Sequence, residues 1–101
     1  MNKDEDMLDG IEKYSVMVAS TAHCNDTSEV ECMLHDASLT IQETTYGFKL
    51  YLGDDILNYM QGANYSEGLK LCILAAISSD CQWLEFDSDG PIYDKVPTYE
   101  W

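Results

Sequence analysis

The sequence predicts an α+β fold, in which an antiparallel or mixed sheet of four to five strands carries two helices mainly on one face. The 101 residues suffice for a single hydrophobic core, and 46% of them are hydrophobic. Segments rich in β-forming residues also alternate with segments of helical periodicity. Residues 1–13 are polar and acidic, so we interpret them as an N-terminal extension to a single domain over residues 14–101.

The first elements of the domain are a strand and a helix. Residues 14–20 are rich in β-forming side chains and apolar on both faces toward their centre, which predicts an interior strand. Four consecutive residues are good helix caps, namely Asn25, Asp26, Thr27 and Ser28. Ser28 with Glu31 also fits a capping box, and apolar residues recur at helical spacing. The pattern therefore predicts a helix over residues 27–36.

The middle of the chain predicts a hairpin followed by the main helix. Residues 37–44 and 48–52 have strand-like alternation and are separated by a tyrosine and a glycine. Residues 56–60 are compatible with a helical turn. The segment 66–79 is apolar almost all round, so we expect a helix packed over the sheet as the main core element.

The C-terminal third predicts a strand, a turn and a docked tail. Residues 81–86 read as a strand, and residues 87–91 as a turn in which Gly90 supplies a positive φ. Residues 92–93 could add a short edge strand. Large aromatic side chains are rarely left in water, so we expect Trp83, Tyr99 and Trp101 to pack together or on the sheet near this turn.

The charge balance disfavours two kinds of partner. The chain has a formal net charge of -14, and its five basic residues are all lysines. A negative field repels polyanions, and no arginine is present to grip phosphate with two hydrogen bonds. We therefore expect no direct binding of nucleic acid or of anionic membranes. No apolar run approaches a bilayer span and no signal segment is evident, which favours the cytoplasm and reduced cysteines.

Two groups of residues contain side chains of types that bind metal ions. His23, Cys24, Cys32 and His35 supply four soft ligands within thirteen residues, but without paired C-x-x-C spacing. Residues 87–90 read Asp-Ser-Asp-Gly and resemble the start of a calcium loop, but no glutamate follows at the twelfth position. We expect neither a metal nor another cofactor.

Catalysis finds little support in the sequence. The chain has no nucleophile elbow, phosphate loop or zinc-hydrolase helix. A small metal-dependent enzyme built around His23 and His35 is the least favoured of three functional hypotheses. We therefore expect a protein that is not an enzyme.

The excess of carboxylates suggests a binding role. Because duplex DNA carries one charge per about 1.7 Å, fourteen excess charges gathered on one face would approach its charge density. Such a face would attract proteins built to hold nucleic acid. The candidate partner-binding residues flank the predicted turn: Glu85, Asp87, Asp89, Asp94 and Glu100. A second acidic cluster would extend this face if the two ends of the chain lay together: Asp4, Glu5, Asp6, Asp9 and Glu12.

Several segments resemble an uncharacterised family of small acidic proteins from bacterial plasmids and phages. Residues 83–91 and 96–101, with their D-x-D-G-P and P-x-Y-x-W motifs, resemble its closing segment. Residues 18–23 resemble its opening strand, and residues 46–51 its central hairpin strand. The resemblance implies a mobile genetic element as the setting and supplies no catalytic residues.

The favoured hypothesis combines the charge with this setting. It is a protein that binds a host protein or ribonucleoprotein through a basic groove, and so inhibits a nucleic-acid-handling defence complex of the anti-CRISPR or anti-restriction type. The alternative is a structural or regulatory interaction protein that does not mimic nucleic acid. The oligomeric state stays open between a monomer and a homodimer.

Overall fold

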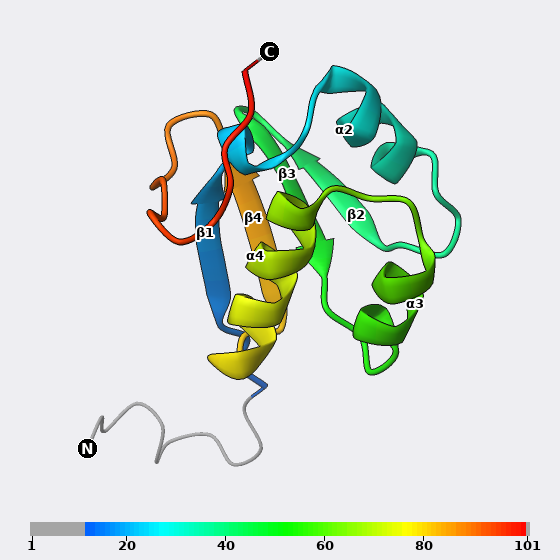
Figure 1. The fold of residues 1–101 in the computed structure, drawn as a ribbon. Coiled ribbons are helices and arrows are strands. Elements are labelled where there is room, and N and C mark those ends of the chain that lie inside the picture. Colours follow the sequence, from blue (N-terminus) through cyan, green and yellow to red (C-terminus); the bar gives the residue numbers. More distant parts are fainter. Residues whose placement is uncertain (1–11, 101) are drawn as a thin grey trace, which may run out of the picture.

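The computed structural model describes residues 12–100, and these form a four-stranded sheet with three α-helices (Figure 1). The strands are β1 (Val16–Ser20), β2 (Ile41–Thr44), β3 (Gly47–Tyr51) and β4 (Trp83–Asp87). The helices are α2 (Thr27–Leu34), α3 (Ile56–Gly62) and α4 (Glu67–Ser78), with a short 3₁₀ helix, η1 (Thr21–His23), after β1. The α+β class is confirmed, with three helices instead of the predicted two.

The sheet is mixed, with the strand order β1-β4-β3-β2. β2 and β3 form the predicted antiparallel hairpin, β3 is antiparallel to β4, and β1 is parallel to β4. The prediction of β1 as an interior strand is wrong, because β1 lies at an edge. Its outer side is covered by the C-terminal segment, since Ser20 N donates to Pro91 O at 2.8 Å and the Tyr93 hydroxyl donates to Val18 O at 2.6 Å.

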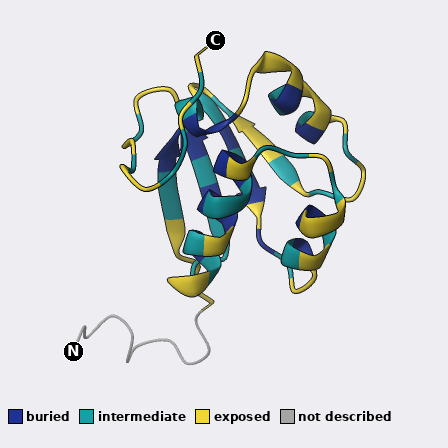
Figure 2. Ribbon diagram, in the orientation of Figure 1, coloured by how far each residue is buried: buried dark blue, intermediate teal, exposed yellow. Residues whose placement is uncertain are grey.

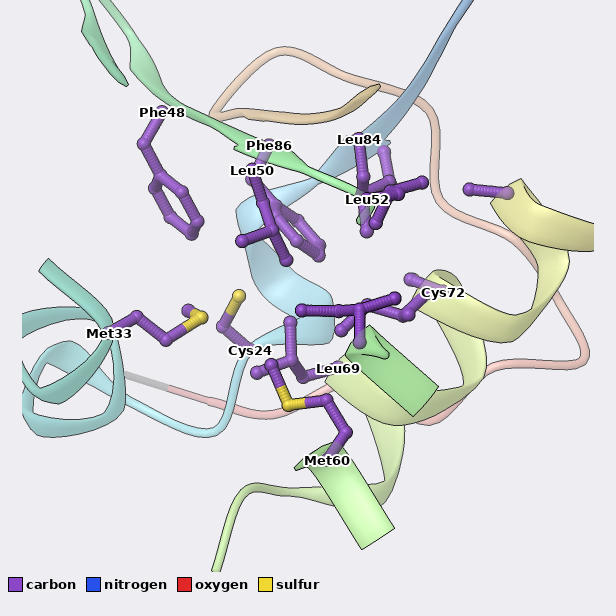
Figure 3. Packing of buried hydrophobic residues seen from close by; sticks show 14 residues of the cluster. Cys24, Met33, Phe48, Leu50, Leu52, Met60, Leu69, Cys72, Leu84 and Phe86 are labelled. Carbon is purple, nitrogen blue, oxygen red and sulfur yellow. The ribbon is translucent and has the colours of Figure 1, made fainter. Parts of the chain in front are cut away.

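The core forms against one face of the sheet (Figure 3). Phe48 and Leu50 of β3 are paired in register with Phe86 and Leu84 of β4, and all four side chains are buried. The residues between them are half-buried or exposed, which gives the strands their alternating colours in Figure 2. Each helix adds buried side chains to this core. α2 contributes Met33, and α3 contributes Ile56 and Met60. The largest contribution comes from α4, with Leu69, Cys72, Ile73 and Ala76.

Two helix ends show how local chemistry sets the boundaries. The capping residue of α2 is Asp26, one of the four candidates, because its side chain accepts a hydrogen bond from Glu29 N at 2.9 Å; the capping box of Ser28 and Glu31 does not start the helix. α4 begins after its cap Ser66 and ends at Ser78, close to the bounds of the predicted segment 66–79. Asp80, which follows the C-cap Ser79, has a φ of 59° in the left-handed region. Cys81 N and Asp80 N then bond back to Ala76 O and Ile77 O, the pattern of a Schellman cap.

Three local expectations need correction. Residues 37–40 are not strand, because Asp36 organises a turn there by accepting from Ser38 N at 2.9 Å. Residues 92–93 run beside β1 without forming a strand. Gly90 does not have a positive φ; a Cβ at this position would lie 2.6 Å from Ala19 O, so the close approach of two backbones requires glycine there.

The expectation that Trp83 and Tyr99 pack together near the turn is wrong. Trp83 is paired with Val16 and Tyr51 at one end of the sheet. Tyr99 bonds to Ala22, which follows β1 at the other end. The expectation that the tail docks on the body is confirmed for Tyr99, and Trp101 lies outside the described residues.

Candidate functional site

Residues 91–100, here called the C-terminal strap, are fastened to the body by His23. The His23 side chain is fully buried, and its Nε2 accepts a hydrogen bond from Tyr93 N at 3.0 Å. Its Nδ1 lies 2.9 Å from Pro97 O. Because a backbone N–H can only donate, Nε2 must be unprotonated, so Nδ1 carries the hydrogen and donates it to the carbonyl. The neutral imidazole therefore holds the strap at two points.

Tyr99 makes a second attachment near the end of the strap. Its backbone N–H donates to Ala22 O at 2.8 Å, and its hydroxyl accepts from Gly68 N at 3.2 Å. Gly68 is buried at the start of α4, where a Cβ would overlap the His23 carbonyl oxygen and would lie 3.0 Å from Pro97 O. The strap, η1 and the first turn of α4 thus form one closely packed unit.

This unit brings three of the five predicted partner-binding carboxylates to one end of the sheet. Asp87 and Asp89 flank the turn at the end of β4, and Glu100 follows Tyr99. Ser88 and Tyr99 line the same hollow of about 340 Å³, which places the two segments beside each other. We call Asp87, Asp89 and Glu100 the acidic end.

The other two predicted carboxylates lie apart from the acidic end. Glu85 is half-buried in the middle of β4, in register with Lys49 of β3. Asp94 is exposed beside Lys95, and both line a hollow next to Ala75 of α4. The structure therefore does not gather all five residues into one patch.

The two ends of the described chain lie at opposite ends of the sheet. The register pairs Val16 with Trp83 and Ser20 with Asp87, so Glu12 precedes the end of β1 that is farther from the acidic end. Four members of the predicted N-terminal acidic cluster lie outside the described residues: Asp4, Glu5, Asp6 and Asp9. Glu12 therefore does not extend the acidic end.

The candidate metal ligands His23, Cys24, Cys32 and His35 do not form a metal site. Both ring nitrogens of His23 are engaged by the strap, while Cys32 and His35 are exposed on and after α2. Cys24 is buried, and this burial raises the pKa of its thiol. Burial likewise raises the pKa of the Cys72 thiol to about 11. Within residues 12–100 no group of three or more His, Cys, Asp or Glu side chains is arranged to hold a metal ion.

The Asp87–Gly90 segment is organised by its own hydrogen bonds. The Asp87 side chain accepts from Asp89 N at 2.8 Å, and Asp87 O accepts from Gly90 N at 2.9 Å. Such a turn fixes the direction of the first carboxylate relative to the strand. The Asp89 side chain is exposed at its tip.

Sequence reasoning missed Glu29, a buried carboxylate that joins two helix starts. Its side chain is 9% exposed and accepts hydrogen bonds from Asn25 N at 2.7 Å and from Ser66 N at 2.6 Å. It also accepts from the Ser66 hydroxyl at 2.7 Å. Glu29 therefore fixes the start of α4 against the start of α2. Only its place three residues after the capping Asp26 could have drawn attention to it.

Asp36 is a second carboxylate that sequence reasoning missed. It accepts hydrogen bonds from the hydroxyls of Tyr59 and Tyr65, the latter at 2.8 Å, and from Ser38 N. The hydrogen bond from Tyr59 is the main cause that lowers the pKa of Asp36 below its ordinary value of 3.8. Burial and the bond to Asp36 raise the pKa of Tyr65. The two tyrosine contacts link residues more than 20 positions apart, so no local pattern signals them.

Replacing Asp36 with asparagine should reduce stability at pH 6 and change its dependence on pH. A carboxylate whose pKa is lowered by folding stabilises the folded state above its unfolded pKa, and this contribution is lost as pH falls. We expect Asp36→Asn to melt about 2–5 °C below the wild type at pH 6 and the difference to shrink below about pH 4. Thermal unfolding at the two pH values measures it. An equal difference at both would show that the charge of Asp36 does not contribute.

The fold and the C-terminal strap together define a class of protein. It is a small acidic α+β domain whose C-terminal strap is hydrogen-bonded to η1 and to the first turn of α4. Residues 16–101 match the C-terminal domain of DUF5983, a family of unknown function. The chain belongs to this family, which confirms the resemblance to an uncharacterised family.

Neither the comparison with curated proteins nor that with solved structures gave a match.

Within residues 12–100, no helix has both the length and the apolar character that crossing a bilayer requires.

Proposed function

We propose that this protein is a cytoplasmic binding protein of a phage or other mobile element. On this proposal it occupies a basic groove of a host protein or ribonucleoprotein and inhibits a nucleic-acid-handling defence complex, of the anti-CRISPR or anti-restriction type. It acts by binding and not by catalysis. The surface that makes the contact is the acidic end.

The observation that carries this proposal is the fastening of the strap. Charge mimicry needs carboxylates at fixed spacing, because a mobile tail loses conformational entropy when it binds. Asp89 stands on a hydrogen-bonded turn, and Glu100 directly follows Tyr99, whose N–H and hydroxyl are both bonded to the body. The acidic end is therefore organised before a partner arrives.

The placement of the lysines supports the same surface. Lys49 is in register with Glu85, and Lys95 adjoins Asp94, so these two carboxylates are partly compensated. Lys70 lines a hollow between α4 and α3 with Leu57 and Met60. Glu85 and Asp94 therefore serve as secondary contacts in the proposal, and the acidic end supplies the main attraction.

The test compares two pairs of neutralised aspartates. Immobilised wild-type protein would first capture partners from host lysate at low salt, and the affinity of the captured protein would then be measured. We expect Asp87→Asn/Asp89→Asn to bind about 5- to 10-fold more weakly at about 50 mM salt, since rim charges each contribute little but add. The difference should shrink at about 300 mM salt, because ions screen exposed charges.

The matched control is Asp54→Asn/Asp55→Asn, which removes the same charge from two exposed residues before α3. We expect this variant to bind like the wild type. Both pairs should melt within a few degrees of the wild type, because exposed charges contribute little to stability. Equal affinity of both pairs at both salt concentrations would exclude the acidic end as the contact.

The protein alone should not bind duplex DNA. With a net charge of -14, the protein is repelled by the phosphates of DNA. It has too few basic side chains to neutralise them and so release the counterions of the duplex. We expect no mobility shift of a labelled duplex at about 10 μM protein and physiological salt. A shifted band that disappears at higher salt would contradict the proposal at its starting point.

A further inference from the structure

The face of the sheet opposite the core carries a row of large apolar side chains. Val16, Trp83 and Tyr51 are in register across β1, β4 and β3. Val16 is 41% exposed and Tyr51 is 39% exposed, although both stand on strands of a folded sheet. We call the residues of this face that β3 and β4 contribute the open face: Gly47, Lys49, Tyr51, Trp83, Glu85 and Asp87.

The open face is ordered by contacts of its own. The rings of Tyr51 and Trp83 meet edge to face with centroids 5.2 Å apart. Lys49 Nζ lies 5.3 Å from the centroid of the Trp83 ring, within reach of a cation–π interaction. In the next row of the sheet Lys49 is in register with Glu85. One cation and one anion thus lie side by side next to an aromatic pair.

This arrangement is complementary to itself. A two-fold axis parallel to the strands, between β3 and β4, would place β3 of one copy over β4 of the other while keeping each row in line. Tyr51 and Lys49 of one copy would then face Trp83 and Glu85 of the other, and the reverse. Tyr51 and Trp83 would each meet an aromatic residue, Lys49 and Glu85 would each meet the opposite charge, and Asp87 would face Gly47.

We propose that the open face is the interface of a homodimer, in which two sheets stack face to face about this axis. This arrangement would cover the exposed Tyr51 and the half-buried Trp83, and would form two Lys49–Glu85 ion pairs between copies. Stacked sheets about 10 Å apart leave room for side chains of this size. Asp89 and Glu100 of the acidic end lie beyond the end of β4, so each copy would keep them accessible, whereas Asp87 and Glu85 stand on the open face and would be covered in the dimer.

The size of the face predicts a weak dimer. Four strands about 4.8 Å apart and five residues at about 3.3 Å each define an area of roughly 300 Å² per copy. Stable interfaces bury about 800 Å² per partner. We therefore expect a dissociation constant in the range of roughly 10–100 μM, at which the dimer and the monomer are both measurable.

Salt separates this interface from the one proposed for the host partner. Two copies that each carry a net charge of -14 repel each other, and the repulsion outweighs two local ion pairs at low ionic strength. We expect dimerisation to strengthen between about 50 and 300 mM salt. Binding of a basic partner through the acidic end should weaken over the same range, so failure of one proposal leaves the other intact.

Sedimentation equilibrium of three variants tests the interface. Glu85→Lys places lysines opposite Lys49 of the other copy, and Lys49→Glu places two glutamates opposite each other, so each variant alone should be monomeric. A mixture of the two should form a heterodimer, because every facing pair then has opposite charges. The control Glu31→Lys makes the same charge change on an exposed position of α2 and should dimerise at least as well as the wild type.

The outcomes are decisive in both directions. Single variants that weaken self-association at least tenfold, with recovery in the mixture, would establish the facing of Lys49 and Glu85, since a folding defect cannot be rescued by mixing. A wild-type protein that stays monomeric at several hundred micromolar in both salts would overturn the proposal. So would a dimer that neither single variant weakens, or variants whose mixture stays monomeric.

Discussion

Replacing Gly68 with alanine is expected to lower the free energy of unfolding by about 3 kcal/mol. The added Cβ would overlap the His23 carbonyl oxygen and approach Pro97 O and the Tyr99 ring. Two of these three neighbours are backbone atoms, which cannot move away as a flexible side chain can. The strap must therefore shift, and the hydrogen bond from Gly68 N to the Tyr99 hydroxyl is lost or lengthened.

The matched control for this substitution is Gly62→Ala at the end of α3. A Cβ at Gly62 meets nothing within 4 Å, so the change should be neutral or stabilise by about 0.5 kcal/mol. Chemical denaturation of both variants measures the difference. If Gly68→Ala unfolded at the wild-type denaturant concentration, the strap would not be packed against α4 as described.

Replacing Glu29 with alanine should cost about 2–4 kcal/mol of stability. Its carboxylate accepts two backbone N–H groups and one hydroxyl in a part-buried position, and the variant leaves these donors without an acceptor. Because the lost contacts join the start of α2 to the start of α4, we expect amide exchange to increase at both helix starts.

Glu31→Ala supplies the comparison, since Glu31 is exposed two positions farther along the same helix. Its effect should lie within about 0.5 kcal/mol of zero. Thermal or denaturant unfolding distinguishes the two, and Glu29→Gln should lie between them because its amide oxygen can still accept. Equal stability of the two alanine variants would refute the role given to Glu29.

The sequence was most informative where the pattern is local. The segment 66–79 predicts α4 closely, because a serine cap and a continuous apolar run leave few alternatives. The hairpin and the strand over residues 81–86 also follow from alternation, and Leu84 and Phe86 share the buried face of β4. These elements depend on neighbours only a few residues apart.

The arrangement of the sheet and the candidate site depends on distant contacts. Nothing in residues 14–20 indicates that Tyr93 and Pro91 cover their outer edge, so an edge strand resembles an interior one. His23 reads as a candidate ligand until Pro97 and Tyr93 are seen to occupy both ring nitrogens. Acidic residues that are close in sequence, such as Glu85 and Asp94, diverge because a strand and a loop direct them to different surfaces.

The pairing of β1 with β4 also determines when the chain can fold during synthesis. The Ser15 backbone N–H is bonded to the Gln82 side chain, 67 residues later, and the whole parallel ladder follows from this point. On the ribosome, the β2–β3 hairpin and the helices can form before β4 emerges, whereas β1 must wait for β4 before it can pair. We therefore expect the edge of β1 to stay exposed to proteases until β4 has emerged.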